Sequence, residues 1–384
     1  MAITKINGGV TAPKGFLASG LNAGIKNQTK KDMAMVFSST PCAAAGVFTT
    51  NLVKAAPVKW DKEIVTTSPY VQAVVVNSGI ANACTGAEGL GYCADTAAEA
   101  AAALNIPKTA VLVASTGVIG KQLPIDKIKS GVTALSKVLG SSREDAKLAA
   151  EAIMTTDTKS KEVACTFELG GKQVTIAGMC KGSGMIHPNM CTMLCFVTTD
   201  AAISHELLQK ALSEDVVDTF NMISVEGEDY KTFCEALHFI MLELSKKIAG
   251  DGEGCTCLFE ATVIGAKDKN QARTIAKSVV CSSLTKAAVF GHDANWGRIL
   301  CAMGYSGAQF DPEVVDIWLE SKAGTIKIVE NGIATDYSEE TATKILSEEE
   351  VIAKMDIKEG NETATAFGCD LTYEYVKING DYRS

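Results

Sequence analysis

The sequence lacks the features that mark membrane, secreted and nucleic-acid-binding proteins. No apolar run approaches the ~18 residues that a membrane-spanning helix needs, and the segment Met1 to Gly20 contains no apolar signal-peptide core. The formal net charge is −9, whereas nucleic-acid-binding proteins usually carry a clustered basic face. These absences predict a soluble, cytoplasmic protein with small-molecule ligands and no nucleic-acid or membrane partner.

Metal-binding and disulfide patterns are also missing. The 13 cysteines include no CxxC pair, and the closest spacing is that of Cys255 and Cys257. Disulfide frameworks are typical of short secreted chains, and structural zinc sites use paired Cys or His spacings. We therefore expect reduced cysteines that are mostly buried, and no metal. With only 4 histidines in the chain, a His-based catalytic triad has little support.

What the sequence does contain is a long globular chain in which strand-like and helix-like patterns alternate. Its 384 residues, 47% hydrophobic and 21% charged, can build a large core. The expected helices are 96–103, opened by a Thr96/Glu99 capping box, and 126–139, 144–154, 205–220, 230–249 and 271–281. The expected strands are 71–76, 110–114, 163–169, 172–177, 193–198, 258–264, 325–329 and 363–378, the last with a bend or break near Gly368. This alternation predicts an α/β protein with sheet and helix layers.

The most unusual local text is KGSGMIHPNMCTMLCFVTTD at Lys181 to Asp200, where a glycine-containing loop runs into an apolar strand. Thr192 stands where the loop becomes the strand. A threonine hydroxyl can act without histidine if it begins a new chain, because its own α-amino group, with a pKa of ~7.7 to 8.0, can serve as the base. An ordinary threonine at the start of a strand is the alternative interpretation.

This segment resembles the cleavage-site signature of the ornithine acetyltransferase family, also called glutamate N-acetyltransferase. Further blocks resemble the family in the same order, from GGVTAPKGF at Gly8 to YVKINGDYRS at the end of the chain. The blocks between these two are FTTNLVKAAPV (48–58), NSGIANACTG (77–86), ASTGVIG (114–120), AIMTTDT (152–158), DGEG (251–254) and GHDANWGRI (291–299).

The resemblance implies a layered fold of the N-terminal-nucleophile-like, DmpA-like type and a chain that cuts itself between Cys191 and Thr192. The products, residues 1–191 and 192–384, would form one interlocked catalytic unit and assemble as α2β2. Thr192 would take the acetyl group from N2-acetylornithine and pass it to glutamate in a ping-pong reaction of arginine biosynthesis. The residue before the cleavage threonine is usually alanine in this family, and here it is Cys191.

The resemblance also assigns site residues. Thr116 and Gly117 match the family's oxyanion hole, although a strand followed by a glycine turn is common in proteins without that role. The positions that match substrate contacts are Thr155, Lys181, Thr192, Glu253, Asn379 and Ser384. We expect Lys181 to pair with an α-carboxylate and Glu253 with the amine end of ornithine.

Two alternative functions stay open at this point. An N-terminal-nucleophile aminopeptidase of similar fold would hydrolyse the acyl-enzyme rather than transfer it, and an unprocessed member could be a non-catalytic binding protein. No cofactor is expected. Whether acetyl-CoA is a second donor, as in bifunctional members, is left open because the sequence shows no phosphate-binding P-loop and coenzyme A sites often lack a short motif.

Overall fold

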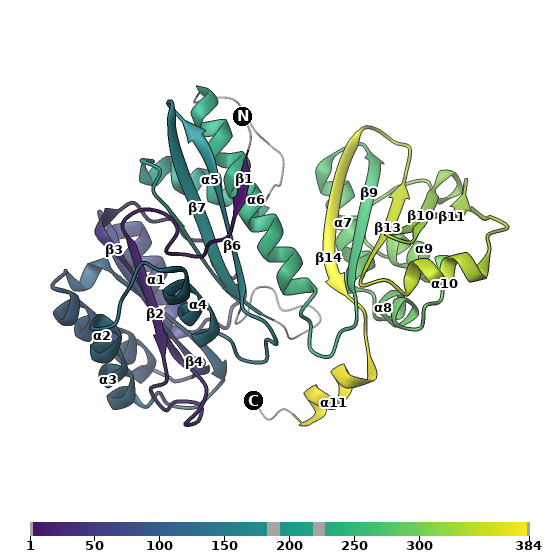
Figure 1. Cartoon of the computed structure of the whole chain (residues 1–384). Coiled ribbons are helices and arrows are strands. Elements are labelled where there is room, and N and C mark those ends of the chain that lie inside the picture. Colours follow the sequence, from purple (N-terminus) through teal and green to yellow (C-terminus); the bar gives the residue numbers. More distant parts are fainter. Residues whose placement is uncertain (1–2, 183–192, 218–226, 382–384) are drawn as a thin grey trace. The chain divides into compact units, whose positions relative to one another are not determined.

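The structure, a computed structural model, describes residues 3–182, 193–217 and 227–381 (Figure 1). The described chain forms two compact units, which are considered separately. The first comprises residues 3–182, 193–217 and 227–244, and the second comprises residues 245–381.

The first unit contains a four-stranded sheet in the order β2-β3-β4-β5. Its strands are β2 (Phe16–Leu21), β3 (Met33–Cys42), β4 (Val71–Ile80) and β5 (Val111–Val118). One face packs on α1 (Ala56–Thr67), α2 (Glu88–Leu104) and α3 (Ile125–Ser136), and β5 is preceded by a short 3-10 helix, Lys108–Ala110. Strands β4 and β5 are parallel and place Ser78 opposite Thr116.

A second sheet of the same unit, in the order β1-β6-β7-β8, is antiparallel throughout. Its strands are β1 (Thr4–Ile6), β6 (Lys161–Leu169), β7 (Lys172–Lys181) and β8 (Leu194–Thr199). Helix α4 (Arg143–Ala152) begins at a capping box formed by Ser142 and Asp145, and its buried alanines share a core with residues of both sheets.

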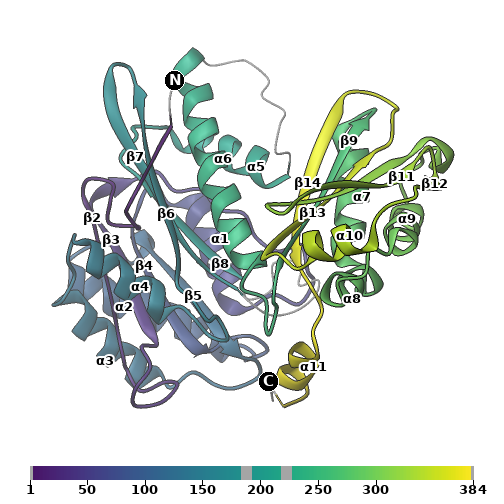
Figure 2. The same ribbon diagram turned by 45° about the vertical axis from the view of Figure 1, so that its right-hand side comes forward.

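Helix α6 (Gly227–Ala249) packs on this second sheet, as Figure 2 shows. A side chain at Gly178 would meet Leu244 and Ile240 of the helix, so the glycine allows the helix to approach β7 closely. Phe233 of the helix lies 6.4 Å from Phe167 of β6, measured between ring centres. Helix α5 (His205–Val217) follows β8. The first unit is thus built of alternating helix and sheet layers.

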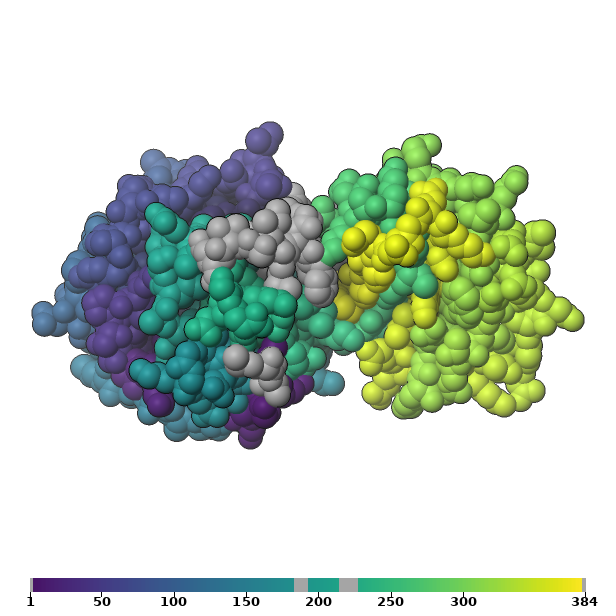
Figure 3. Space-filling view, turned by 90° about the horizontal axis from the view of Figure 1, so that it is seen from above, coloured from purple at the N-terminus to yellow at the C-terminus, as the bar shows by residue number. Residues whose placement is uncertain are grey.

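The second unit is a six-stranded mixed sheet in the order β12-β11-β10-β13-β9-β14. Its strands are β9 (Leu258–Ala266), β10 (Asp316–Ser321), β11 (Gly324–Glu330), β12 (Ile333–Ala334), β13 (Glu350–Asp356) and β14 (Glu362–Cys369). Its helices are α7 (Lys269–Cys281), α8 (Ser283–Phe290), α9 (Trp296–Gly304), the 3-10 helix Pro312–Val314, α10 (Glu339–Leu346) and α11 (Tyr373–Asp381). Strand β14 is at one edge of the sheet, and the yellow C-terminal segment is visible at the surface of this unit in Figure 3.

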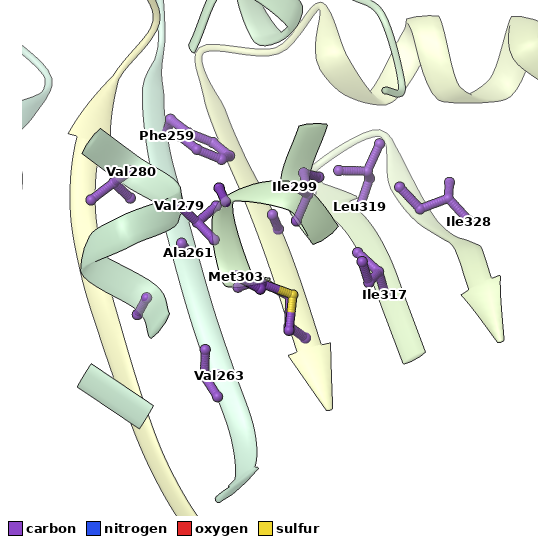
Figure 4. Packing of buried hydrophobic residues seen from close by; sticks show 14 of the residues in the cluster. Phe259, Ala261, Val263, Val279, Val280, Ile299, Met303, Ile317, Leu319 and Ile328 are labelled. Carbon is purple, nitrogen blue, oxygen red and sulfur yellow. The ribbon is translucent and has the colours of Figure 1, made fainter. Parts of the chain in front are cut away.

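The core of the second unit lies between this sheet and its helices. Figure 4 shows Phe259 and Val263 of β9 facing Val279 of α7 and Met303 of α9, and all four side chains are buried. Apolar residues alternate along the strands and recur at helical spacing in α7, which is why these segments take up their observed structures.

The α/β class with sheet and helix layers is confirmed by this architecture. No helix in the described parts of the chain combines the length and the apolar character needed to cross a membrane.

Several local predictions were wrong. Helix α2 begins at Glu88, so Thr96 is internal to it and its hydroxyl donates to the Tyr92 carbonyl rather than forming a capping box with Glu99. The strand expected over 363–378 ends at Cys369, next to the break expected near Gly368, but helix α11 follows it in place of further strand. The Thr372 hydroxyl accepts a hydrogen bond from the Tyr375 N–H and so satisfies one of the free donors of the first helical turn.

The cysteines are less buried than expected. Among those that the structure describes, 4 are buried, 5 are partly buried and 3 are exposed. No disulfide joins any of these described cysteines.

Candidate functional site

Thr116 and Gly117 lie near the carboxyl end of β5, which pairs with β4. Gly117 has a φ of +128°, and a Cβ atom there would lie 2.3 Å from the carbonyl carbon of Gly79 on the neighbouring strand. Only glycine fits both the backbone conformation and this close approach. Gly117 is therefore a constrained position within the β4–β5 strand pair.

Lys181, the last residue of β7 in the other sheet, contacts this part of β5. Its ammonium group donates a hydrogen bond to Thr116 Oγ1 over 3.2 Å, and both residues are buried. The structure thus brings together a residue expected in the oxyanion hole and a residue expected to bind substrate.

Asp157 organises the backbone around Lys181. Its Oδ1 atom accepts from the Gly182 N–H at 2.8 Å and from the Lys161 ammonium group at 2.6 Å, and its Oδ2 atom accepts from the Thr155 N–H at 3.0 Å. Asp157 and Lys161 are both buried, so the pair is a buried ion pair. Thr155 and Lys181, two expected substrate contacts, are thereby tied to one carboxylate, Thr155 directly and Lys181 through its neighbour.

The charges in this region have identifiable effects on ionisation. Burial by itself would raise the pKa of Asp157, but the hydrogen bond and positive charge of Lys161 and the backbone hydrogen bond from Thr155 lower it below its ordinary value. Burial lowers the pKa of nearby Lys26 to about 8. The Lys26 ammonium group donates to the carbonyl groups of Met154 and Lys31, so it also holds the residue that precedes Thr155.

Glu253 and Asn379, two further expected substrate contacts, meet in the second unit. Asn379 Nδ2 on α11 donates to Glu253 Oε2 over 2.7 Å and also to the Tyr375 carbonyl over 2.9 Å. Both side chains are half-buried. The amide therefore orients a carboxylate whose second oxygen has further acceptor sites for a cation.

The loop that carries Glu253 is tied to the segment before α11. The Asp370 carboxylate accepts from the backbone N–H and the hydroxyl of Thr256, at 2.9 and 2.6 Å. The Thr372 hydroxyl donates to the Gly254 carbonyl at 2.7 Å. Gly254 has a φ of +68°, and a Cβ there would come within 2.7 Å of Glu374. These contacts fix the position of Glu253 relative to α11.

Of the expected site residues, Cys191, Thr192 and Ser384 lie outside the described residues. Thr116, Gly117, Thr155 and Lys181 belong to the first unit and Glu253 and Asn379 to the second. Sequence reasoning missed Asp157, Lys161 and Lys26 as supports of the site. The AIMTTDT block included Asp157, and its spacing of four residues from Lys161 was a signal that could have been used.

One group of side chains within the described residues has donor atoms spaced closely enough for a metal ion, namely Cys255, Cys369 and Asp370. Both carboxylate oxygens of Asp370 already accept hydrogen bonds from Thr256, and one also accepts from the Cys257 N–H.

Comparison with known proteins gives consistent matches along the chain. A family model described as the ArgJ family matches residues 17–229 and 226–384. The arginine biosynthesis bifunctional protein ArgJ of Thermotoga neapolitana is 48% identical, over 97% of this chain and 99% of that protein. The protein of the same name from Symbiobacterium thermophilum is 50% identical, over 98% of this chain and 99% of that protein. A solved chain of ornithine acetyltransferase from Mycobacterium tuberculosis, complexed with ornithine, is 44% identical and covers 48% of this chain and 97% of that chain, with a TM-score of 0.45.

Proposed function

The chain belongs to the ArgJ family, whose members are acetyltransferases of arginine biosynthesis, and we propose that it transfers acetyl from N2-acetylornithine to glutamate through an acyl-enzyme on Thr192. The products are ornithine and N-acetylglutamate. The curated relatives are named bifunctional, and we extend the proposal to acetyl-CoA as a second acetyl donor to glutamate. Its substrates are small molecules, and we place the enzyme in the cytoplasm.

The observation that carries the proposal is the hydrogen bond from Lys181 to Thr116, next to Gly117 in strand β5. Leu194 of β8 pairs with Lys181 of β7, and Thr192 precedes Leu194 by two positions in the sequence. Thr192 therefore shortly precedes strand β8 in the sequence. Strand β8 pairs with β7, whose last residue, Lys181, donates to Thr116 of the proposed oxyanion hole.

Activation begins with attack of the Thr192 hydroxyl oxygen on the carbonyl carbon of Cys191. The peptide nitrogen leaves as the α-amino group of Thr192, and an ester joins the two chains. Water then hydrolyses this ester and leaves a carboxylate on Cys191. The new amine has a reference pKa of ~7.7 to 8.0, which suits a general base near neutral pH.

In the transfer reaction the same hydroxyl attacks the acetyl carbonyl of N2-acetylornithine, and the α-amino group takes its proton. The Thr116 hydroxyl and the Gly117 N–H donate to the developing oxyanion, and removing one such donor typically costs about 3 to 4 kcal/mol of transition-state stabilisation. Ornithine leaves with a proton, and the amine of glutamate then attacks the acetyl-threonine ester. We assign Lys181 to the α-carboxylate of the substrate and Glu253 to the δ-ammonium of ornithine.

The fold also supports lasting association of the two products of cleavage. In the sequence, strand β7 precedes the proposed cut and strand β8 follows it. The two strands are paired along their length, from the pair Ile176 and Thr199 to the pair Lys181 and Leu194. The backbone hydrogen bonds of this pair and its packing under α6 would hold residues 1–191 to residues 192–384. We propose that the resulting heterodimers assemble further as α2β2.

Denaturing electrophoresis and mass spectrometry of the purified protein test the proposal. We expect two fragments, with masses that locate the cut before Thr192, and one intact chain in the Thr192→Ala variant. Thr192→Ser should still cleave because serine keeps the hydroxyl. A wild-type chain that stays intact while transferring acetyl groups at full rate would refute the mechanism.

A further inference from the structure

Two cysteines of the second unit lie together beside the loop that carries Glu253. Cys255 follows Glu253 by two residues, and Cys369 ends strand β14. Their sulfur atoms and a carboxylate oxygen of Asp370 all lie within 4.8 Å of one another. A Cβ on Gly252 would lie 2.5 Å from Cys369 Sγ, so the absence of a side chain at Gly252 leaves the room that this sulfur occupies.

The surroundings make the two thiols chemically unequal. The Lys286 ammonium group lies 3.8 Å from Cys369 Sγ, and Lys286 is only 5% exposed. The Cys255 thiol donates to the Gly250 carbonyl over 3.5 Å and also faces Cys369. Its hydrogen bond to Cys369, together with the charge of Lys286, lowers the pKa of Cys369 to about 7. The same hydrogen bond and burial raise the pKa of Cys255. Cys369, beside the Lys286 ammonium group, is therefore the sulfur of the pair that ionises more readily.

A metal site fits these residues less well. Asp370 is 3% exposed, and its oxygens already accept hydrogen bonds from the Thr256 N–H, the Thr256 hydroxyl and the Cys257 N–H. A structural zinc ion takes four protein ligands, and here two thiols remain beside a buried lysine ammonium group. The cationic neighbour stabilises a thiolate and opposes a divalent ion.

We propose that Cys255 and Cys369 form a redox-active pair that a hydroperoxide oxidises to a disulfide. The Cys369 thiolate attacks the terminal oxygen of the hydroperoxide and becomes a sulfenic acid, and the alcohol, or water from hydrogen peroxide, leaves after protonation. The Cys255 sulfur then gives up its proton and attacks the Cys369 sulfur. The S–S bond forms, and the hydroxyl leaves as water. Two electrons pass from the thiols to the peroxide, and a small thiol reverses the reaction by exchange.

The disulfide would act on the position of Glu253. It would bring the two sulfurs to about 2.05 Å and link residue 255 covalently to residue 369, next to the turn that leads to α11. Glycines at 250, 252 and 254 allow the loop to follow this movement. The hydrogen bond between Asn379 and Glu253 spans the same two segments, so its geometry would change. This consequence rests on the proposed function, since it predicts weaker binding of N2-acetylornithine.

The test uses the full-length protein treated with hydrogen peroxide, denatured in N-ethylmaleimide and digested for mass spectrometry. We expect a peptide pair linked through Cys255 and Cys369, which dithiothreitol separates. Cys369→Ser should abolish the link, and in Cys255→Ser the oxidised Cys369 should be trapped by dimedone as a sulfenic acid. Cys301→Ser is the matched control, because Cys301 is exposed on α9 of the same unit and should leave the link intact.

Enzyme kinetics provide the second readout. Oxidation should raise KM for N2-acetylornithine about tenfold, equal to about 1.4 kcal/mol, in the wild type and in Cys301→Ser but not in Cys255→Ser. Absence of the linked peptide, or faster oxidation of Cys301 than of Cys369, would overturn the proposal. The proposal would also be overturned if peroxide formed no disulfide and the protein instead bound zinc, with binding lost in both Cys255→Ser and Cys369→Ser. If the disulfide formed without a change in KM, the proposed effect of the disulfide on Glu253 would be wrong. Lack of transfer by the reduced wild type would count against the proposed function instead, because the peptide readout does not need activity.

Discussion

Asn in place of Asp157 should strongly destabilise the first unit. The change removes the carboxylate that lies 2.6 Å from the Lys161 ammonium group and leaves that cation buried, with its side chain 2% exposed. Asn also has one acceptor oxygen for the three donors that Asp157 now satisfies, the N–H groups of Thr155 and Gly182 and the Lys161 ammonium group. Removing one partner of a buried ion pair typically costs about 3 to 5 kcal/mol.

The free energy of unfolding from denaturant titration measures this cost. The matched control is Glu340→Gln, which removes an ion pair of the same four-residue spacing, with Lys344, in which both side chains are exposed. That variant should leave the unfolding midpoint unchanged because exposed pairs contribute little. Adding Lys161→Met to Asp157→Asn should restore part of the stability, since it removes the buried ammonium group that has lost its carboxylate partner.

The pH dependence of the unfolding free energy provides a second test of the Asp157–Lys161 ion pair. Because the pKa of Asp157 is lower in the folded protein than its ordinary value of 3.8, its contribution is fully present above that value. It is lost as the pH falls through the lower folded pKa. Asp157→Asn should flatten this acid limb of the stability curve. A loss of less than about 1 kcal/mol, no larger than that of Glu340→Gln, would refute the account of Asp157 as a buried anchor.

Three further predictions concern other residues. Lys181→Met should raise KM for N2-acetylornithine by roughly 10- to 100-fold through loss of a charge-assisted contact to the carboxylate, and an unchanged KM in steady-state kinetics would remove Lys181 from that role. Gly117→Ala should abolish soluble expression or lower the thermal midpoint sharply, since its φ is +128° and its Cβ would meet Gly79 at 2.3 Å. Gly91→Ala is the matched control and should be tolerated, because Gly91 lies inside helix α2 with no atom within 4 Å of a built Cβ. Equal behaviour of the two variants would contradict the packing argument. Burial raises the pKa of Asp61 to about 8, so this group makes the protein lose stability as the pH rises from 3.8 to about 8, by up to ~1.4 kcal/mol per pH unit. In urea titrations at several pH values, Asp61→Asn should lack this fall of the unfolding free energy with pH. A fall equal to that of the wild type would contradict the assignment to Asp61.

The fold class and most elements of the first half could be predicted because their patterns are strong locally. Four of the six residues from Val71 to Val76 are buried in β4, and the buried spacing of Ile128, Val132 and Leu135 marks α3. Val138 extended that spacing in the sequence, but it lies beyond the end of the helix and is 53% exposed. Helix α11 was missed because β-branched and aromatic residues in its sequence favour a strand, and the capping contact at Thr372 overrides that local preference.

Only those site residues that match family motifs could be predicted from the sequence. Lys181 and Thr116 are 65 positions apart, and only the packing of one sheet on the other brings their side chains together. Asp157 is a plain acidic residue in the sequence, and its role follows from the three donors that converge on it. The proximity of Cys255 and Cys369 could likewise not be predicted from the sequence, because it depends on the pairing of strand β14 with strand β9.

The most direct test of the acetyl-transfer mechanism is mass spectrometry of the fragment that begins at Thr192, after incubation with isotope-labelled N2-acetylornithine in the absence of glutamate. One labelled acetyl group is expected on Thr192, and added glutamate should remove it as labelled N-acetylglutamate. A fragment that carries no label, or a label released as acetate at the same rate with and without glutamate, would contradict it.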